Sequence, residues 1–126
     1  DYLETATLAV ARWLEDCPHV ETVLHPALPS CPGHEHWKRD FTGSASVFSF
    51  TFKDSLSAKQ VETFLDSLAI FRIGLSWGGV TSLAVVYPDL DRPGQDFGGR
   101  LVRLNIGMEA TADLIADLES AMTAAF

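Results

Sequence analysis

The chain has 126 residues, the size of one ordinary domain, so a second independent core is not expected. Seventeen acidic side chains against nine basic ones give a net charge of −8, which argues against a nucleic-acid partner and against an anionic membrane surface. Hydrophobic residues make up 47% of the chain, a globular composition, yet no run approaches the roughly 18 apolar residues of a spanning helix.

The first expected element is a helix over residues 2–17, where apolar side chains recur at helical spacing until Pro18 ends the pattern. No capping residue or loop precedes this helix, and the chain starts at Asp1 rather than at methionine. We therefore expect further sequence upstream of it. Residues 20–24 are rich in β-branched side chains and predict a short strand.

Residues 25–43 contain three prolines and predict a long loop with room for one helical turn. Four potential zinc ligands lie there: His25, Cys31, His34 and His36. Their spacing matches no familiar zinc motif, so packed or solvated side chains are favoured over a metal site. The two cysteines, Cys17 and Cys31, form no C-x-x-C pair, and we expect two free thiols in the cytoplasm.

The second half alternates strands and helices. Residues 46–52 place three phenylalanines on one side of a half-buried strand, and Ser57 followed by Gln60 fits a capping box that opens a helix. Further strands are expected over 71–75, 82–87 and 100–106, with a polar loop over 88–99. An amphipathic helix is expected over 111–126, with a solvated face that carries its acids: Asp113, Asp117 and Glu119.

These elements predict an α+β domain in which a small, mostly antiparallel sheet of four to five strands is covered by helices on one face. The other face of the sheet is then either wet or docked against something else. In the strand over 100–106, alternation points Val102 and Leu104 toward the helices. It leaves Arg103 on the open side.

An arginine in the middle of a strand is partly desolvated and needs an anion. Its planar fork suits a carboxylate or a phosphate held by two hydrogen bonds. From Arg103 alone, an internal ion pair with one of the many acids is the favoured interpretation. Ser76 and Trp77 stand before two adjacent glycines, and such a turn could help to build a site for a small carboxylate.

Several stretches, taken together, resemble the C-terminal domain of the Cys/Met-metabolism pyridoxal-phosphate enzymes, most closely their cystathionine β-lyase branch. The resemblance covers nearly the whole chain in order. Tryptophan after serine at Ser76-Trp77 resembles the β-lyase branch in particular. The stretches are HPALP (25–29), GHE (33–35), KRDFTG (38–43), residues 46–52, SWGG (76–79) with Ser82-Leu83, and RLNIG (103–107) with the helix over 113–119.

The resemblance implies a fold-type-I enzyme that uses pyridoxal 5′-phosphate (PLP) to cleave cystathionine into homocysteine, pyruvate and ammonia. It implies that Arg103 grips the substrate α-carboxylate and that Ser76 and Trp77 line the same pocket, which reverses the preference for an internal ion pair. It also implies a homotetramer. Thr81 and Leu75 depart from residues common in the family, which puts fine substrate preference in doubt.

The chain has only three lysines, Lys38, Lys53 and Lys59, and none lies in a motif like that of the cofactor lysine. We therefore expect residues 1–126 to be the single C-terminal domain of a larger enzyme, without catalytic, cofactor or metal residues of its own and inactive alone. Two alternatives stay open. One is a stand-alone module that binds a small anion or a partner, and the other is the same domain of a γ-lyase or γ-synthase.

Overall fold

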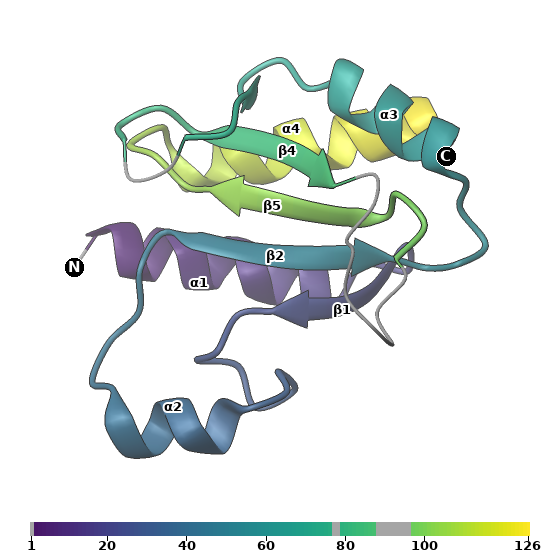
Figure 1. Cartoon of the computed structure of the whole chain (residues 1–126). Coiled ribbons are helices and arrows are strands. Elements are labelled where there is room, and N and C mark those ends of the chain that lie inside the picture. Colours follow the sequence, from purple (N-terminus) through teal and green to yellow (C-terminus); the bar gives the residue numbers. More distant parts are fainter. Residues whose placement is uncertain (1, 77–78, 88–96) are drawn as a thin grey trace.

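The structure, a computed structural model, describes residues 2–76, 79–87 and 97–126. The described elements alternate between helices and strands (Figure 1). In chain order they are α1 (Tyr2–Glu15), β1 (Val20–Leu24), α2 (His34–Asp40), β2 (Val47–Phe52), α3 (Ala58–Asp66), β3 (Arg72–Ile73), β4 (Leu83–Tyr87), β5 (Leu101–Asn105) and α4 (Thr111–Ala125).

The strands form one mixed sheet in the order β1-β2-β5-β4-β3. Four of them pair antiparallel, whereas the two-residue β3 pairs parallel with β4 at the edge. Strand β5 therefore lies in the middle of the sheet, between β2 and β4. The predicted α+β class, with a small and mostly antiparallel sheet, is confirmed.

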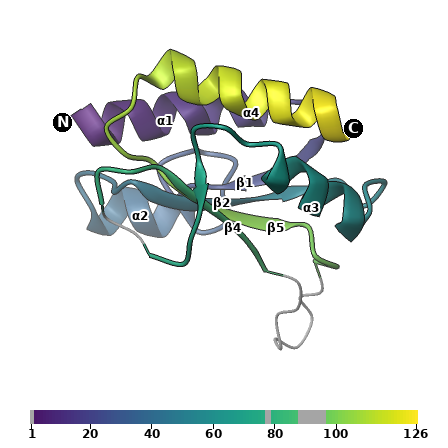
Figure 2. The same ribbon diagram turned by 90° about the horizontal axis from the view of Figure 1, so that it is seen from above.

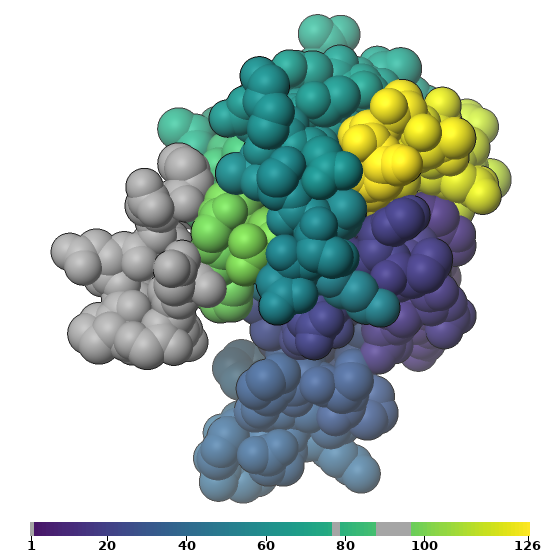
Figure 3. Space-filling model, turned by 90° about the vertical axis from the view of Figure 1, so that its right-hand side faces the viewer, coloured from purple at the N-terminus to yellow at the C-terminus, as the bar shows by residue number. Residues whose placement is uncertain are grey.

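The core lies between the sheet and the helices. The three phenylalanines of β2, Phe48, Phe50 and Phe52, are each at most 4% exposed, as their alternation predicts. Helices α1 and α4 lie side by side over this face of the sheet (Figure 2). The space-filling view shows α4 packed between α1 and α3 at the end of the molecule where the chain finishes (Figure 3).

Helix α3 begins with the predicted capping box. The Ser57 hydroxyl accepts the backbone N–H of Gln60 at 3.1 Å, and the Gln60 side chain accepts the backbone N–H of Ser57 at 2.9 Å. Two backbone donors at the start of the helix are satisfied in this way. Val61, Phe64 and Leu65 then face the core. The predicted cap and the predicted apolar stripe are therefore both confirmed.

Two segments differ from the sequence-based expectation. The long loop contains a helix of seven residues, α2, whose side chains are all at least partly exposed. The strand expected over residues 71–75 is only two residues long, and the side chains of Ile73 and Leu75 are 63% and 69% exposed. Phe71, the first apolar residue of the expected alternation, is buried, but no second layer covers Ile73 and Leu75 at this edge of the sheet.

Candidate functional site

Arg103 lies at the centre of the sheet. It is the middle residue of β5 and sits in register with Ser49 of β2 and Val85 of β4. Its neighbours in the strand, Val102 and Leu104, are fully buried on the helix side. Alternation therefore directs Arg103 to the face that the helices leave open, as the sequence predicted.

The guanidinium of Arg103 lies across this open face. Its Nη2 donates a hydrogen bond to the backbone carbonyl of Leu75, and its Cζ lies 5.7 Å from the centre of the Tyr87 ring. That distance is within the range at which an aromatic face attracts a cation. The carbonyl and the ring thus orient the guanidinium over the open face.

Arg103 thus contacts the peptide unit that joins Leu75 to Ser76. Ser76 is the next residue, and its side chain is exposed. The structure therefore brings two of the three predicted site residues to one place, the open face beside the end of β3. The third, Trp77, lies outside the described residues.

Part of the open face, around Asn105, is covered by neighbouring segments of the chain. Asn105, two residues after Arg103, is only 1% exposed because neighbouring segments cover it. Its side chain accepts a hydrogen bond from the Ser46 hydroxyl at 3.1 Å and donates one to the Thr81 carbonyl at 3.3 Å. Asn105 therefore ties the segment before β4 to the middle of the sheet.

Glu109, just before α4, makes a pair of long-range hydrogen bonds that sequence reasoning missed. Its carboxylate accepts the backbone N–H of Ser82 at 3.0 Å and the Ser82 hydroxyl at 2.7 Å. The Ser82 oxygen in turn accepts the backbone N–H of Gly107 at 2.8 Å. Partial burial raises the pKa of Glu109, but the hydrogen bonds from Ser82 outweigh it and leave the pKa below its ordinary value.

Asp117 corrects the expectation that the acids of the last helix share a solvated face. Its side chain is 7% exposed and accepts three backbone N–H groups, those of Ala69, Ile70 and Phe71, at 2.8 to 3.0 Å. These three residues connect α3 to β3. A helix position three residues after the buried Leu114 already belongs to the core-facing stripe, which was the signal available in the sequence.

The histidines and cysteine of residues 25–36 are engaged in separate local contacts. His34 Nδ1 lies 2.8 Å from the Pro26 carbonyl, whereas His25 Nδ1 accepts the backbone N–H of Ala27 at 3.2 Å. Within residues 2–76, 79–87 and 97–126, no three His, Cys, Asp or Glu side chains come together in an arrangement that could hold a metal ion. The segment instead borders a cavity of about 710 Å³ between α2 and the start of β2.

The two thiols are free, as expected. Burial, with a smaller contribution from Glu119, raises the pKa of Cys17 to about 11. Burial also raises the pKa of Cys31. A thiol must lose its proton to act as a nucleophile, so neither cysteine is suited to covalent chemistry at neutral pH.

His25 makes the free energy of unfolding depend on pH. Burial lowers its pKa below the ordinary value of 6.5, and its ring packs against Phe48. As the pH falls below about 6.5, the unfolded chain takes up a proton at His25 before the folded chain does, so the free energy of unfolding decreases. We expect urea unfolding to show this decrease between about pH 7 and pH 5, and a shallower one in His25→Asn.

The control is His36→Asn, which changes an exposed histidine of the same segment. It should keep the pH dependence of the unmodified chain. Equal slopes in His25→Asn and the unmodified chain would contradict the assignment.

None of the helices in the described residues is both long and apolar enough to cross a membrane.

The chain is similar in sequence to members of one enzyme family. The sequence model of one family, described as Cys/Met metabolism PLP-dependent enzyme, matches residues 3–123. The chain is 47% identical over 124 residues to the cystathionine beta-lyase of Escherichia coli K12, and 42% identical over 126 residues to that of Haemophilus influenzae. It is also 40% identical over 126 residues to the cystathionine gamma-lyase of Bos taurus.

These matches cover 91%, 93% and 94% of the chain, in that order, but only 31% of each relative. The chain therefore spans about a third of the length of the curated relatives it matches.

Proposed function

The chain belongs to the Cys/Met metabolism PLP-dependent enzyme family, and we propose that it is the C-terminal domain of a carbon–sulfur lyase that acts on cystathionine. In this proposal the complete enzyme releases homocysteine, pyruvate and ammonia. The domain described here contributes the site for the α-carboxylate of the substrate, formed by Arg103, Ser76 and Trp77.

The observation that carries the proposal is the placement of the Arg103 guanidinium on the open face of the sheet. A guanidinium presents its N–H donors in a planar fork, and a carboxylate accepts two of them in parallel. The Leu75 carbonyl and the Tyr87 ring limit how far the fork can turn. A substrate carboxylate held in this way fixes the orientation of the Cα–H bond, which is the contribution of this chain to the reaction.

The chain itself does not fit the cofactor. A lysine that forms a Schiff base must lose its proton readily, which burial or a neighbouring cation brings about. Lys38, Lys53 and Lys59 are all exposed, and the Lys59 amine lies 3.7 Å from the carboxylate of Glu62. We propose that another domain of the enzyme, the large PLP domain, supplies the cofactor lysine, and that the chain alone turns over no substrate.

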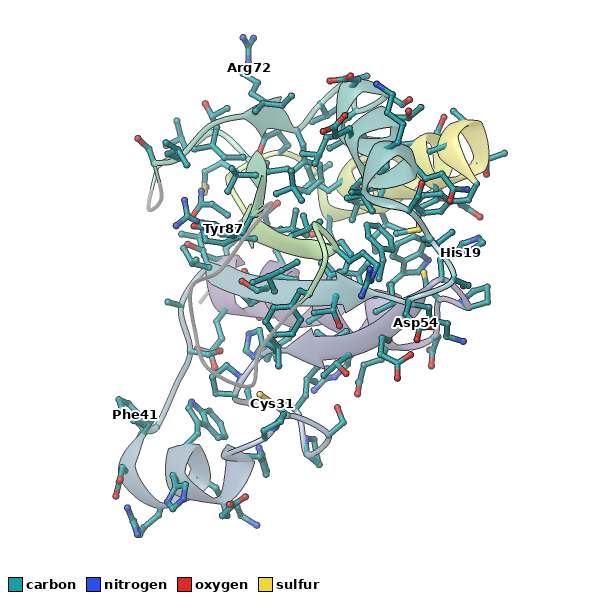
Figure 4. The ribbon with its side chains drawn as sticks, turned by 45° about the vertical axis from the view of Figure 1, so that its right-hand side comes forward. His19, Cys31, Phe41, Asp54, Arg72 and Tyr87 are labelled. Atoms are coloured by element: carbon teal, nitrogen blue, oxygen red, sulfur yellow. The ribbon has the colours of Figure 1, made fainter. Side chains whose placement is uncertain are left out.

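The test is Arg103→Ala in the complete enzyme with PLP and L-cystathionine. Loss of a charge-assisted, two-point contact should lower kcat/KM by about a hundred-fold or more. The matched control is Arg72→Ala, because Arg72 lies on β3 at the edge of the sheet and points away from the protein (Figure 4). Its kcat/KM should stay within about two-fold of the unmodified enzyme. An unchanged kcat/KM in Arg103→Ala would refute the assigned role.

A γ-lyase or γ-synthase is the second candidate, favoured by the 40% identity to the bovine cystathionine gamma-lyase. The products distinguish the two lyases, since β-elimination of cystathionine gives pyruvate and homocysteine, whereas γ-elimination gives 2-oxobutanoate and cysteine. We expect pyruvate. If the isolated chain bound a small anion but the complete enzyme did not cleave thioethers, it would instead be a binding module.

We further propose that the enzyme acts in the cytoplasm as a homotetramer. The two free thiols support the location, because an oxidising compartment favours disulfides. The tetramer follows from the resemblance to the family, and the molar mass of the complete enzyme by light scattering tests it.

A further inference from the structure

The segment between α3 and β4 carries Ser76 and contacts Arg103, yet it has little regular structure of its own. Strand β3 has two residues, and the apolar side chains of Ile73, Leu75 and Val80 are 63%, 69% and 74% exposed. An exposed segment with few buried contacts opens readily unless hydrogen bonds tie it to the core. The position of the Leu75 carbonyl and of Ser76 therefore depends on such ties.

Glu109 makes one such tie, to Ser82. Both carboxylate oxygens of Glu109 accept hydrogen bonds from Ser82: Oε2 accepts the backbone N–H, and Oε1 accepts the hydroxyl. Ser82 is fully buried, so its ends of these two bonds are shielded from water. Glu109 itself is held in place, since its backbone carbonyl accepts the hydroxyl of Tyr2 from α1 at 3.1 Å.

A hydrogen-bonded path runs from Ser82 to Arg103. The Ser82 carbonyl accepts the backbone N–H of Arg72 at 3.0 Å, and two residues later Gly74 donates to Ala84 at 3.2 Å. The next residue is Leu75, whose carbonyl accepts the Arg103 guanidinium. A displacement of Ser82 therefore disturbs the hydrogen bonds between β3 and β4. It also shifts the Leu75 carbonyl that accepts the hydrogen bond from Arg103.

We infer that Glu109 is a positioning residue for the substrate carboxylate: through Ser82 it fixes the 72–76 segment and hence the orientation of the Arg103 fork. This inference rests on the proposed role of Arg103. A carboxylate suits the task because Ser82 presents two donors, its N–H and its hydroxyl, and both need acceptors. Glutamine has only one oxygen and would turn a donating NH₂ group toward one of them.

The test uses the complete PLP enzyme with Glu109→Gln, and Ser82→Ala as a second variant that removes one of the two bonds. Two quantities are measured: the KM for L-cystathionine, and hydrogen exchange of the amides of residues 72–76 followed by mass spectrometry. Glu109→Gln should raise KM by about ten-fold, with a smaller change in kcat, because a misplaced fork weakens substrate binding. The 72–76 amides should exchange faster, and Ser82→Ala should show the same pattern to a smaller extent.

The matched control is Ser57→Ala, which removes the cap of α3 and lowers stability without touching the segment. It should leave KM and exchange at 72–76 unchanged. A Glu109→Gln enzyme with the KM of this control, or with unchanged exchange at 72–76, would overturn the inference. If Arg103→Ala leaves kcat/KM unchanged, the proposed function fails instead, whereas a loss of kcat/KM in Arg103→Ala without a rise of KM in Glu109→Gln overturns the positioning role alone.

Discussion

Replacing Gly107 by alanine is expected to lower the free energy of unfolding by about 3 kcal/mol or more. A Cβ at this position would lie 2.2 Å from the Val80 carbonyl oxygen and 2.7 Å from the Ser82 nitrogen. Both atoms belong to the backbone, so no side-chain rotation relieves the overlap. The segment before β4 must move away, which breaks the bond from Gly107 N–H to the Ser82 hydroxyl.

Urea unfolding of the chain measures this effect, and Gly79→Ala is the matched control. Gly79 lies in the same segment, but a Cβ there would meet no atom within 4 Å. The Gly79→Ala variant should differ from the unmodified chain by less than about 1 kcal/mol in free energy of unfolding. Equal losses in the two variants would contradict the close approach of the two backbones at Gly107.

Replacing Asp117 by alanine is expected to cost about 3 to 5 kcal/mol of stability. The change leaves three backbone N–H groups, those of residues 69–71, without their acceptor. The side chain of Asp117 is buried and the N–H of Phe71 is buried as well, so water replaces the lost bonds poorly. Asp117→Asn keeps one of the two oxygens and should fall between alanine and the unmodified chain.

Glu119→Ala is the control for Asp117, because Glu119 is an exposed acid on the same helix. Urea unfolding should show a change of less than about 0.5 kcal/mol for it. If Asp117→Ala were no more destabilising than Glu119→Ala, Asp117 would belong to a solvated face, as the sequence pattern alone suggested.

The features that the sequence predicted correctly depend on neighbours along the chain. The alternation of Phe48, Phe50 and Phe52 is a property of one strand, and the capping box of Ser57 and Gln60 spans one turn of helix. The open-face position of Arg103 follows in the same way from the burial of its two strand neighbours. Such patterns can be read from the sequence because a regular strand or helix brings side chains to the buried face at a fixed spacing.

The features that the sequence did not predict join residues far apart. Asp117 binds residues 46 to 48 positions before it, and Glu109 binds Ser82 across 27 positions. Glu109 lies before α4 and has no local signature of its role, and for Asp117 the core-facing position on α4 does not reveal which distant groups it binds. The short β3 is missed for a related reason: alternation predicts which side chains share a face, but not whether a second layer covers that face.

The central claim, that Arg103 binds the α-carboxylate of the substrate, is tested most directly by a preference measurement on the complete PLP enzyme. The kcat/KM for a thioether amino acid is compared with that for its α-carboxamide, in the unmodified enzyme and in Arg103→Ala. The account predicts that the unmodified enzyme prefers the carboxylate by about a hundred-fold and that the preference falls to a few-fold in the variant. A variant that retained the whole preference would contradict it.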